Sequence, residues 1–196
     1  MGVAPLWLAR AVSIVAIIAM MAIRAPHGRR SRTVTVVDDR KDTWEILLLL
    51  LSIAGWWLPL VWAAASILAF ADYPLRAGPL AAGVVCYALG LALFYRSHAD
   101  LGTNWSVTLQ LRNNHRLITR GVYRYIRHPM YSALLVYAAG QALVVPNWLA
   151  GPSYLISLAI LCVRRVALEE AMMLDTFGDE YTAYTTTTSR FIPGIW

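Results

Sequence analysis

Four long stretches of the 196-residue sequence carry no charge or almost none, and they decide what kind of fold the chain can adopt. They cover residues 3–23, 46–71, 77–95 and 130–163. Uncharged apolar runs of about 18 residues or more are typical of segments that cross a lipid bilayer. Only 14% of the residues are charged, against about a quarter in soluble domains. The sequence therefore predicts an integral membrane protein and excludes a soluble domain, a disordered chain and a secreted disulfide scaffold.

The fourth stretch, residues 130–163, is too long for one span and too short for two full spans with a turn. Pro146-Asn147 and Gly151-Pro152 interrupt its middle, so we expect two short helices that form a hairpin. Residues 3–23 lack a small-x-small cleavage site, and we expect them to remain as a span. The prediction is an all-α, polytopic membrane protein with five transmembrane helices.

The positions of the basic residues predict the orientation of these helices. With the N-terminus outside, fifteen of the seventeen lysines and arginines fall on the cytoplasmic side, and Arg10 and Arg76 fall outside. Loop arginines and lysines gather on the cytoplasmic side of membrane proteins. A single span over 130–163 would place Arg164 and Arg165 outside and weaken this bias. The C-terminus is therefore predicted to be cytoplasmic.

This topology divides the chain into two predicted regions. Residues 1–95 hold the first three helices and a cytoplasmic loop, 24–45. Residues 96–196 hold a cytoplasmic loop (96–128), the hairpin (130–163) and a cytoplasmic C-terminal helix (164–196). Folding back of the hairpin brings the loop and the C-terminal helix together, so this second part is where we expect a water-soluble ligand to bind and catalysis to occur.

The loop before the hairpin contains a dense group of polar residues that ends in Arg127-His128-Pro129-Met130-Tyr131. Its arginines recur every three or four residues, so that on a helix they would form one basic stripe, and an interfacial segment facing anionic lipid headgroups is the simpler explanation for them. Pro129 suits the first position of a membrane helix, with His128 before it and Gly121 as a turn residue. The start of a helix is a ready site for a carboxylate or phosphate. His128 and Tyr131 would frame that site, or merely cap and anchor the helix.

A second group of charges follows the hairpin directly. Arg165 and Glu169 are spaced to share one helix face. An exposed pair of this kind contributes only about 0.3–0.5 kcal/mol, and a solvated helix start would explain it. Charges at a membrane boundary are nevertheless functional candidates, because burying them is costly. The segment Phe177-Gly178-Asp179-Glu180-Tyr181 is expected to pack against the preceding loop and cover it.

Several classes of function are excluded by missing motifs. The sequence has no G-x-G-x-x-G after a strand, no P-loop, no H-E-x-x-H and no Ser/His/Asp order. Cys86 and Cys162 are isolated, and the four histidines lack the spacing of metal ligands. We expect no metal and no nucleic-acid partner.

Taken together, these motifs resemble the isoprenylcysteine carboxyl methyltransferase family of membrane enzymes, which use S-adenosylmethionine. The resemblance covers about residues 101–192: His-x-Leu-Ile, Gly-Val-Tyr, Arg-His-Pro-x-Tyr, the hairpin, an arginine four residues before a glutamate, and Phe-Gly-Asp-Glu-Tyr. The first hundred residues match only in hydropathy. The acidic run is cut to Glu169-Glu170, which leaves the key glutamate in place. Five spans stand where animal members have eight, and this difference bears on the substrate, because the missing helices could shape lipid access.

The resemblance implies roles for particular residues. It places substrate contact on Arg165. It places cofactor binding on Gln110, His115, Leu117, Ile118, Tyr123, His128, Pro129, Met130, Tyr131 and Glu169. The implied reaction is methyl transfer from S-adenosylmethionine to the carboxylate of a lipophilic, prenylcysteine-like acceptor that enters from the bilayer, at the membrane–cytoplasm interface. Such an enzyme would be similar to a protein-S-isoprenylcysteine O-methyltransferase.

Three other functions stay open. A phospholipid or amine N-methyltransferase would share the architecture and cofactor, but its acceptor must lose a proton and would favour a carboxylate near the methyl group over Arg165. A membrane sterol reductase would bind NADPH instead. A small transporter or scaffold would use the polar residues only for orientation, although transport usually needs polar groups at mid-membrane, and the spans offer little beyond Ser, Tyr and Cys.

Overall fold

The structure, a computed structural model, describes residues 3–31, 36–39, 43–102, 110–112 and 117–195. Its α-helices are α1 (Leu6–Ser31), α2 (Thr43–Ala64), α3 (Ala77–Leu101), α4 (Pro129–Val144), α5 (Ser153–Phe177) and α6 (Asp179–Thr187). Two short 3₁₀ helices, η1 (Ser66–Ala71) and η3 (Gly121–Arg124), and two short strands, β1 (Val36–Asp39) and β2 (Gln110–Arg112), complete the elements.

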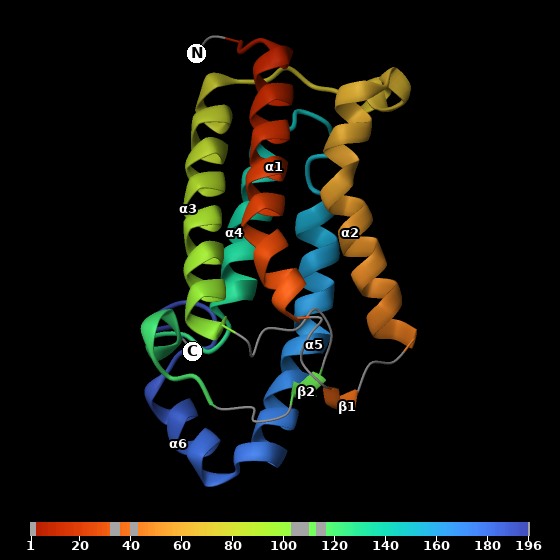
Figure 1. Ribbon diagram of the computed structural model, residues 1–196. Coiled ribbons are helices and arrows are strands. Elements are labelled where there is room, and N and C mark those ends of the chain that lie inside the picture. Colours follow the sequence, from red (N-terminus) through yellow and green to blue (C-terminus); the bar gives the residue numbers. More distant parts are fainter. Residues whose placement is uncertain (1–2, 32–35, 40–42, 103–109, 113–116, 196) are drawn as a thin grey trace.

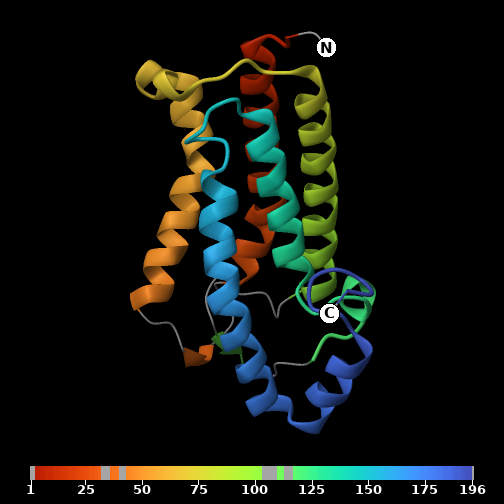
Figure 2. The ribbon, with the colours of Figure 1, turned by 180° about the vertical axis from the view of Figure 1, so that it is seen from behind.

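The first four α-helices and the first part of α5 form an elongated bundle (Figure 1). Helix α5 continues beyond one end of this bundle, and α6 turns back from it toward η3 (Figure 2). The N-terminus lies at the opposite end. The charged loop before α4 and the charged half of α5 therefore meet at one end of an apolar bundle, as the hairpin prediction required.

Within the described residues, three helices are long and apolar enough to cross a membrane: Leu6–Pro26 within α1, Thr43–Ala64 and Ala77–Leu101. Large apolar side chains on these helices are exposed, including Val15, Leu50 and Val85. Outward apolar side chains are expected where lipid rather than water surrounds a helix. Helix α4 is apolar but has 16 residues, and α5 carries charges in its second half. The integral membrane character is thus supported, and five spans and their orientation stay predictions.

The break within residues 130–163 takes the form that the sequence predicted. Helix α4 ends at Val144, α5 begins at Ser153, and Pro146-Asn147 and Gly151-Pro152 lie in the turn between them. The buried Asn147 side chain accepts hydrogen bonds from the backbone N–H groups of Leu149 and Ala150. Asn147 therefore satisfies two backbone N–H groups within the turn.

Helices α3 and α4 pack at very short distance because glycines line their contact. A Cβ atom added at Gly90 would lie 2.8 Å from the backbone nitrogen of Tyr137 and 2.9 Å from the oxygen of Ala133. A Cβ added at Gly140 would lie 2.9 Å from the oxygen of Gly83. Small residues that let helix backbones approach closely are typical of packing in membranes. This contact fixes the start of α4, where the polar residues gather.

The loops differ from the sequence prediction in two respects. The predicted loop 96–128 begins later, because α3 continues to Leu101. Within it, residues 121–124 form a single 3₁₀ turn, and the described part shows no α-helix with a basic stripe. The all-α prediction holds for most of the described residues, but β1 pairs antiparallel with β2. This pairing joins segments far apart in the sequence, which local patterns do not reveal.

Candidate functional site

Polar and charged side chains gather at the end of the bundle where α4 begins. Pro129 is the first residue of α4 and His128 directly precedes it, as predicted. The missing N–H of proline costs nothing at this position. The backbone before the helix is set by Gly121, which has a φ of +60°, and a Cβ there would overlap the Asp100 carboxylate. Asp100 accepts a 2.8 Å hydrogen bond from the Val122 N–H, which secures the turn predicted at Gly121.

The predicted pair of Arg165 and Glu169 forms on α5 and is extended by Tyr131 of α4. Arg165 Nε donates a 3.0 Å hydrogen bond to Glu169 Oε1. The same oxygen accepts a 2.5 Å hydrogen bond from the Tyr131 hydroxyl. Arg165 is buried and Glu169 is half-buried, so this is not the exposed helical pair of a solvated surface. The contact brings the predicted substrate residue and two predicted cofactor residues into one cluster.

A second carboxylate reaches Arg165 from α2. Glu45 lies in the first turn of α2, and its Oε1 is 3.4 Å from Arg165 Nη1. Both side chains are almost fully buried, at 7% exposure for Arg165 and 3% for Glu45. Burial alone would lower the pKa of the Arg165 guanidinium, but Tyr131, Glu169 and Glu45 outweigh it and raise that pKa. Arg165 is therefore a permanent cation in this site.

His128 lies between two acidic side chains of α5. Its Nδ1 is 3.6 Å from Glu169 Oε2, and its Nε2 is 3.2 Å from Glu170 Oε1. The ring also lies 5.8 Å from the Tyr131 ring and 5.9 Å from the Phe191 ring, centroid to centroid. His128 makes no side-chain cap of α4. His128 thus occupies the N-cap position that the sequence predicted without capping α4 through its side chain. Its ring links the start of α4 to α5.

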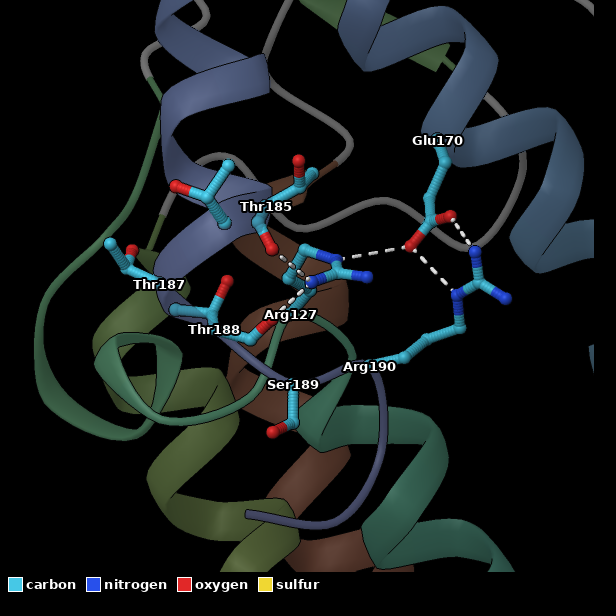
Figure 3. A pocket seen from close by; sticks show the side chains of 8 residues that line it. Arg127, Glu170, Thr185, Thr187, Thr188, Ser189 and Arg190 are labelled. Carbon is cyan, nitrogen blue, oxygen red and sulfur yellow. Dashed lines mark hydrogen bonds and ion pairs between the residues drawn. The ribbon is translucent and has the colours of Figure 1, made fainter. Parts of the chain in front are cut away.

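Glu170 is the centre of a second cluster that also includes two arginines (Figure 3). Arg127 Nε lies 3.1 Å from Glu170 Oε1, and Arg190 Nη2 lies 2.6 Å from Oε2. Burial of Glu170 opposes its charge, but hydrogen bonds from His128, Arg190 and Arg127 lower its pKa to about 2. With residues 185–189, these three residues line an open, polar cavity of about 500 Å³.

Residues 188–191, which we call the C-terminal strap, run across the start of α4. The backbone N–H groups of Arg127 and His128 donate to the oxygens of Ser189 and Arg190 at 2.8 and 3.1 Å. The Ser132 hydroxyl donates to the oxygen of Phe191 at 2.7 Å. Helix α6 also holds the loop, because the Tyr184 hydroxyl donates a 2.5 Å hydrogen bond to the oxygen of Tyr123. The C-terminal segment thus packs against the loop through Tyr184 and the C-terminal strap, which lie after the predicted residues 177–181.

Six of the ten predicted cofactor residues lie close to one another in the structure. Tyr123, His128, Pro129, Met130, Tyr131 and Glu169 lie around the start of α4 and the middle of α5. Leu117 and Ile118 are half-buried in the chain leading to η3. Gln110 lies in β2, where the structure describes the backbone, and His115 lies outside the described residues. Among the described residues, no three His, Cys, Asp or Glu side chains are grouped as for a metal ion.

The sequence interpretation missed three partners in this site. Glu45 directly precedes the apolar run 46–71 and was assigned to the loop, although it is the one acidic residue of α2. Arg127 was noted only as a member of its motif and of the loop arginines, and Arg190 only as a basic residue on the cytoplasmic side; the structure shows both bonded to Glu170. An acidic residue beside an apolar run was a usable signal for Glu45, because such charges need a partner. Nothing local in the sequence indicated the pairing of residues 127, 170 and 190.

The fold and the site define a helical membrane protein with a charged site at one end of its bundle. Residues 83–175 match the model of the isoprenylcysteine carboxyl methyltransferase family, which confirms the resemblance expected from the motifs. This region includes η3, α4 and the Arg165–Glu169 pair, and it excludes α2 with Glu45.

Individual relatives carry names of the same kind. A protein-S-isoprenylcysteine O-methyltransferase of Tribolium castaneum is 30% identical over 115 residues, 58% of this chain and 41% of that protein. The enzyme of that name from Schizosaccharomyces pombe is 30% identical over 117 residues, 59% of this chain and 49% of that protein. A probable one from Oryza sativa subsp. indica is 33% identical over 89 residues, 45% of this chain and 47% of that protein. The match spans less than half the length of these relatives.

A solved structure supports the fold. The structure of the eukaryotic intramembrane Ras methyltransferase ICMT is similar with a TM-score of 0.55 and 24% sequence identity. The likeness covers 81% of this chain and 55% of that chain. The shared architecture therefore includes part of the chain outside residues 83–175.

Proposed function

We propose that this protein transfers a methyl group from S-adenosylmethionine to the carboxylate of a lipophilic, prenylcysteine-like acceptor at the membrane–cytoplasm interface. The observation that carries the proposal is the buried Arg165, one helical turn before Glu169, which is itself bonded to Tyr131 at the start of α4. The cluster lies inside the region that matches the methyltransferase family. It also lies at the charged end of an apolar bundle, where a lipid-borne carboxylate would meet a water-soluble donor.

The proposed reaction requires little acid–base catalysis from the protein. S-adenosylmethionine supplies a methyl group on a positively charged sulfur, which an oxygen nucleophile can take by in-line displacement. A carboxyl acceptor with a pKa of about 4 is already ionised at neutral pH, so no general base is needed. Arg165 would hold this carboxylate by charge-assisted hydrogen bonds and fix its direction of attack. Its burial keeps competing water away from the guanidinium.

The residues present fit the proposed cofactor. Both hydrogen bonds that Glu169 accepts from Tyr131 and Arg165 go to Oε1, whereas Oε2 faces His128 at 3.6 Å. Oε2 can accept from the ammonium or a ribose hydroxyl of the cofactor. The start of α4 offers partial positive charge for the cofactor carboxylate. Tyr123 and Met130 would contribute apolar surface beside it.

One observation favours the second candidate, an amine N-methyltransferase. Glu45 adds a buried carboxylate 3.4 Å from Arg165, and an amine acceptor would need such a group to accept the proton that it loses. One assay distinguishes the two functions. Purified protein is incubated with methyl-labelled S-adenosylmethionine and a prenylated cysteine analogue, and the labelled product is treated with base. We expect base-labile label, as in a methyl ester, and base-stable label would instead indicate a methylamine.

A further inference from the structure

Three exposed arginines lie around η3, at the end of the bundle where α4 begins. Arg120 directly precedes this 3₁₀ turn and Arg124 is its last residue. Arg96 lies on α3, four residues before Asp100, whose carboxylate contacts η3. Residues four apart share one helix face, so Arg96 projects on the side of α3 that faces η3. The three arginines therefore belong to one basic surface.

None of these three arginines forms an ion pair within the part of the chain that the structure describes. The carboxylate of Asp100 is half-buried and accepts a 2.8 Å hydrogen bond from the Val122 N–H, which leaves it engaged in the turn. Arg127 differs from the three, because it is bound to Glu170. The surface around η3 therefore presents positive charge that no carboxylate of the described chain balances.

Exposed apolar side chains lie beside these arginines. Arg124 stacks over the ring of Tyr125 at 4.7 Å, and Tyr125 is 54% exposed. The C-terminal end of the chain lies next to η3 and the end of α3 (Figures 1 and 2), where the Ser189 N–H donates to the Tyr125 oxygen at 3.3 Å. Beyond Ser189, Ile192 and Ile195 are exposed in a turn that their own backbones close with a 3.0 Å hydrogen bond. Basic and apolar groups thus share what we call the η3 surface: Arg96, Arg120, Arg124, Tyr125, Ile192 and Ile195.

The position of the η3 surface indicates what binds there. It adjoins the end of α3 at Leu101, a helix apolar enough to cross a membrane, and the start of the apolar α4 at Pro129. A free anion would pair with the arginines but would leave the aromatic and aliphatic side chains in water. A phospholipid with an anionic headgroup meets both needs, because its phosphate pairs with guanidinium groups and its acyl chains contact the apolar side chains.

We infer that the η3 surface binds the headgroups of anionic phospholipids in the adjoining leaflet. The inference goes beyond the proposed methyl transfer and does not depend on it, since none of the six side chains belongs to the proposed cofactor or acceptor site. It also gives the exposed C-terminal turn a role, which is to place its two isoleucines among the lipids that the arginines attract.

Native mass spectrometry of the full chain in detergent tests the inference. The probes are dioleoylphosphatidylglycerol, dioleoylphosphatidylcholine, which has the same tails and no net charge, and inorganic phosphate as a competitor without tails. Each arginine near an anionic lipid contributes about fivefold to binding, so three should favour phosphatidylglycerol over phosphatidylcholine about 100-fold. Salt should reduce this preference, because exposed charges are screened. Equal affinity for the two lipids would overturn the inference, and displacement of phosphatidylglycerol by inorganic phosphate would indicate a site for free anions instead.

Two arginines of α3 provide a matched pair of variants. Arg96→Gln should raise the Kd for phosphatidylglycerol about fivefold. Arg76→Gln removes an exposed arginine at the opposite end of α3 and should leave that Kd unchanged. Equal effects of the two substitutions, or wild-type affinity of Arg96→Gln, would overturn the inference.

A triple variant tests whether charge carries the preference. Arg96→Gln/Arg120→Gln/Arg124→Gln should bind phosphatidylglycerol no better than phosphatidylcholine. The corresponding triple substitution to lysine should keep most of the preference, because an ammonium also binds phosphate as a point charge. A preference that survives in the glutamine variant would overturn the inference, and the single variants decide the question if this triple variant does not fold.

Discussion

The Tyr131 hydroxyl donates a 2.5 Å hydrogen bond to Oε1 of Glu169. This bond joins the first turn of α4 to α5 at the end of the bundle where the chain turns polar. Arg165 donates to the same oxygen. The Glu169 carboxylate therefore holds both the start of α4 and the Arg165 guanidinium of α5 in place. The proposed cofactor and acceptor positions are thereby set relative to each other.

Tyr131→Phe removes this bond without changing the shape of the ring. A hydrogen bond to a charged group contributes about 1.5–3 kcal/mol, so we expect the Kd for S-adenosylmethionine to rise about tenfold or more. Calorimetric titration measures it. Tyr125→Phe is the control, since Tyr125 is exposed on the same loop, and it should bind like the wild type. His128→Ala is expected to act in the same direction as Tyr131→Phe. Wild-type kinetics of both variants at limiting S-adenosylmethionine would show that Tyr131 and His128 serve the fold alone.

Glu169→Gln tests the cofactor role directly. The substitution keeps the size of the side chain but removes the charge that would accept from the cofactor ammonium. Loss of a charge-assisted hydrogen bond should weaken S-adenosylmethionine binding at least about tenfold. Glu180→Gln on the exposed surface of α6 is the matched control. Unchanged cofactor affinity of Glu169→Gln in calorimetry, with the protein folded, would remove Glu169 from the cofactor site.

Local signals in the sequence were sufficient for the central parts of the site. Pro146-Asn147 and Gly151-Pro152 located the turn of the hairpin, and Pro129 located the start of α4. The four-residue spacing of Arg165 and Glu169 predicted their contact. Each of these features depends on neighbours along the chain, where backbone preference and helical periodicity decide the outcome.

The contacts that were missed join residues far apart in the sequence. Glu45 meets Arg165, and Glu170 meets Arg127 and Arg190, through packing of α2, α5 and the C-terminal strap. The sequence could indicate that these charged residues form ion pairs, but which residues pair with each other depends on how the helices pack. The spacing of the loop arginines also fits a helix, but Gly121 and the contact of its turn with Asp100 impose a 3₁₀ turn over residues 121–124.

Glu170 should make the stability of the protein depend on pH in the acidic range. Its pKa in the folded state is lowered to about 2 from an ordinary value of 4.5. A carboxylate whose pKa is lowered by folding stabilises the fold fully above its unfolded pKa, and the contribution is lost as the pH falls toward the folded pKa. We expect the C-terminal strap to loosen between about pH 4.5 and pH 2, as protonation weakens the bonds from Arg127 and Arg190.

Glu170→Gln isolates this contribution from that of the other carboxylates. The variant should lower the free energy of unfolding at pH 7 by about 1 kcal/mol, a modest value because solvent screens a partly exposed cluster. Unfolding in detergent is followed for both proteins at several pH values. The difference between them should shrink as the pH falls below 4.5, whereas a difference independent of pH would rule out the charge of Glu170 as its cause.

Arg165→Lys tests the assignment of the acceptor site. Lysine keeps the charge beside Glu45 and Glu169 but loses the planar pair of donors that can hold a carboxylate in one direction. Misdirection of a reacting group can cost about 100-fold in rate, so turnover of a prenylated cysteine analogue should fall strongly while cofactor binding stays near normal. Arg164→Lys is the matched control, because Arg164 is exposed and points about 100° away on the same helix. Normal turnover of a carboxylate by Arg165→Lys, or methylation of amines alone by the wild type, would replace the carboxyl methyltransferase proposal with the N-methyltransferase one.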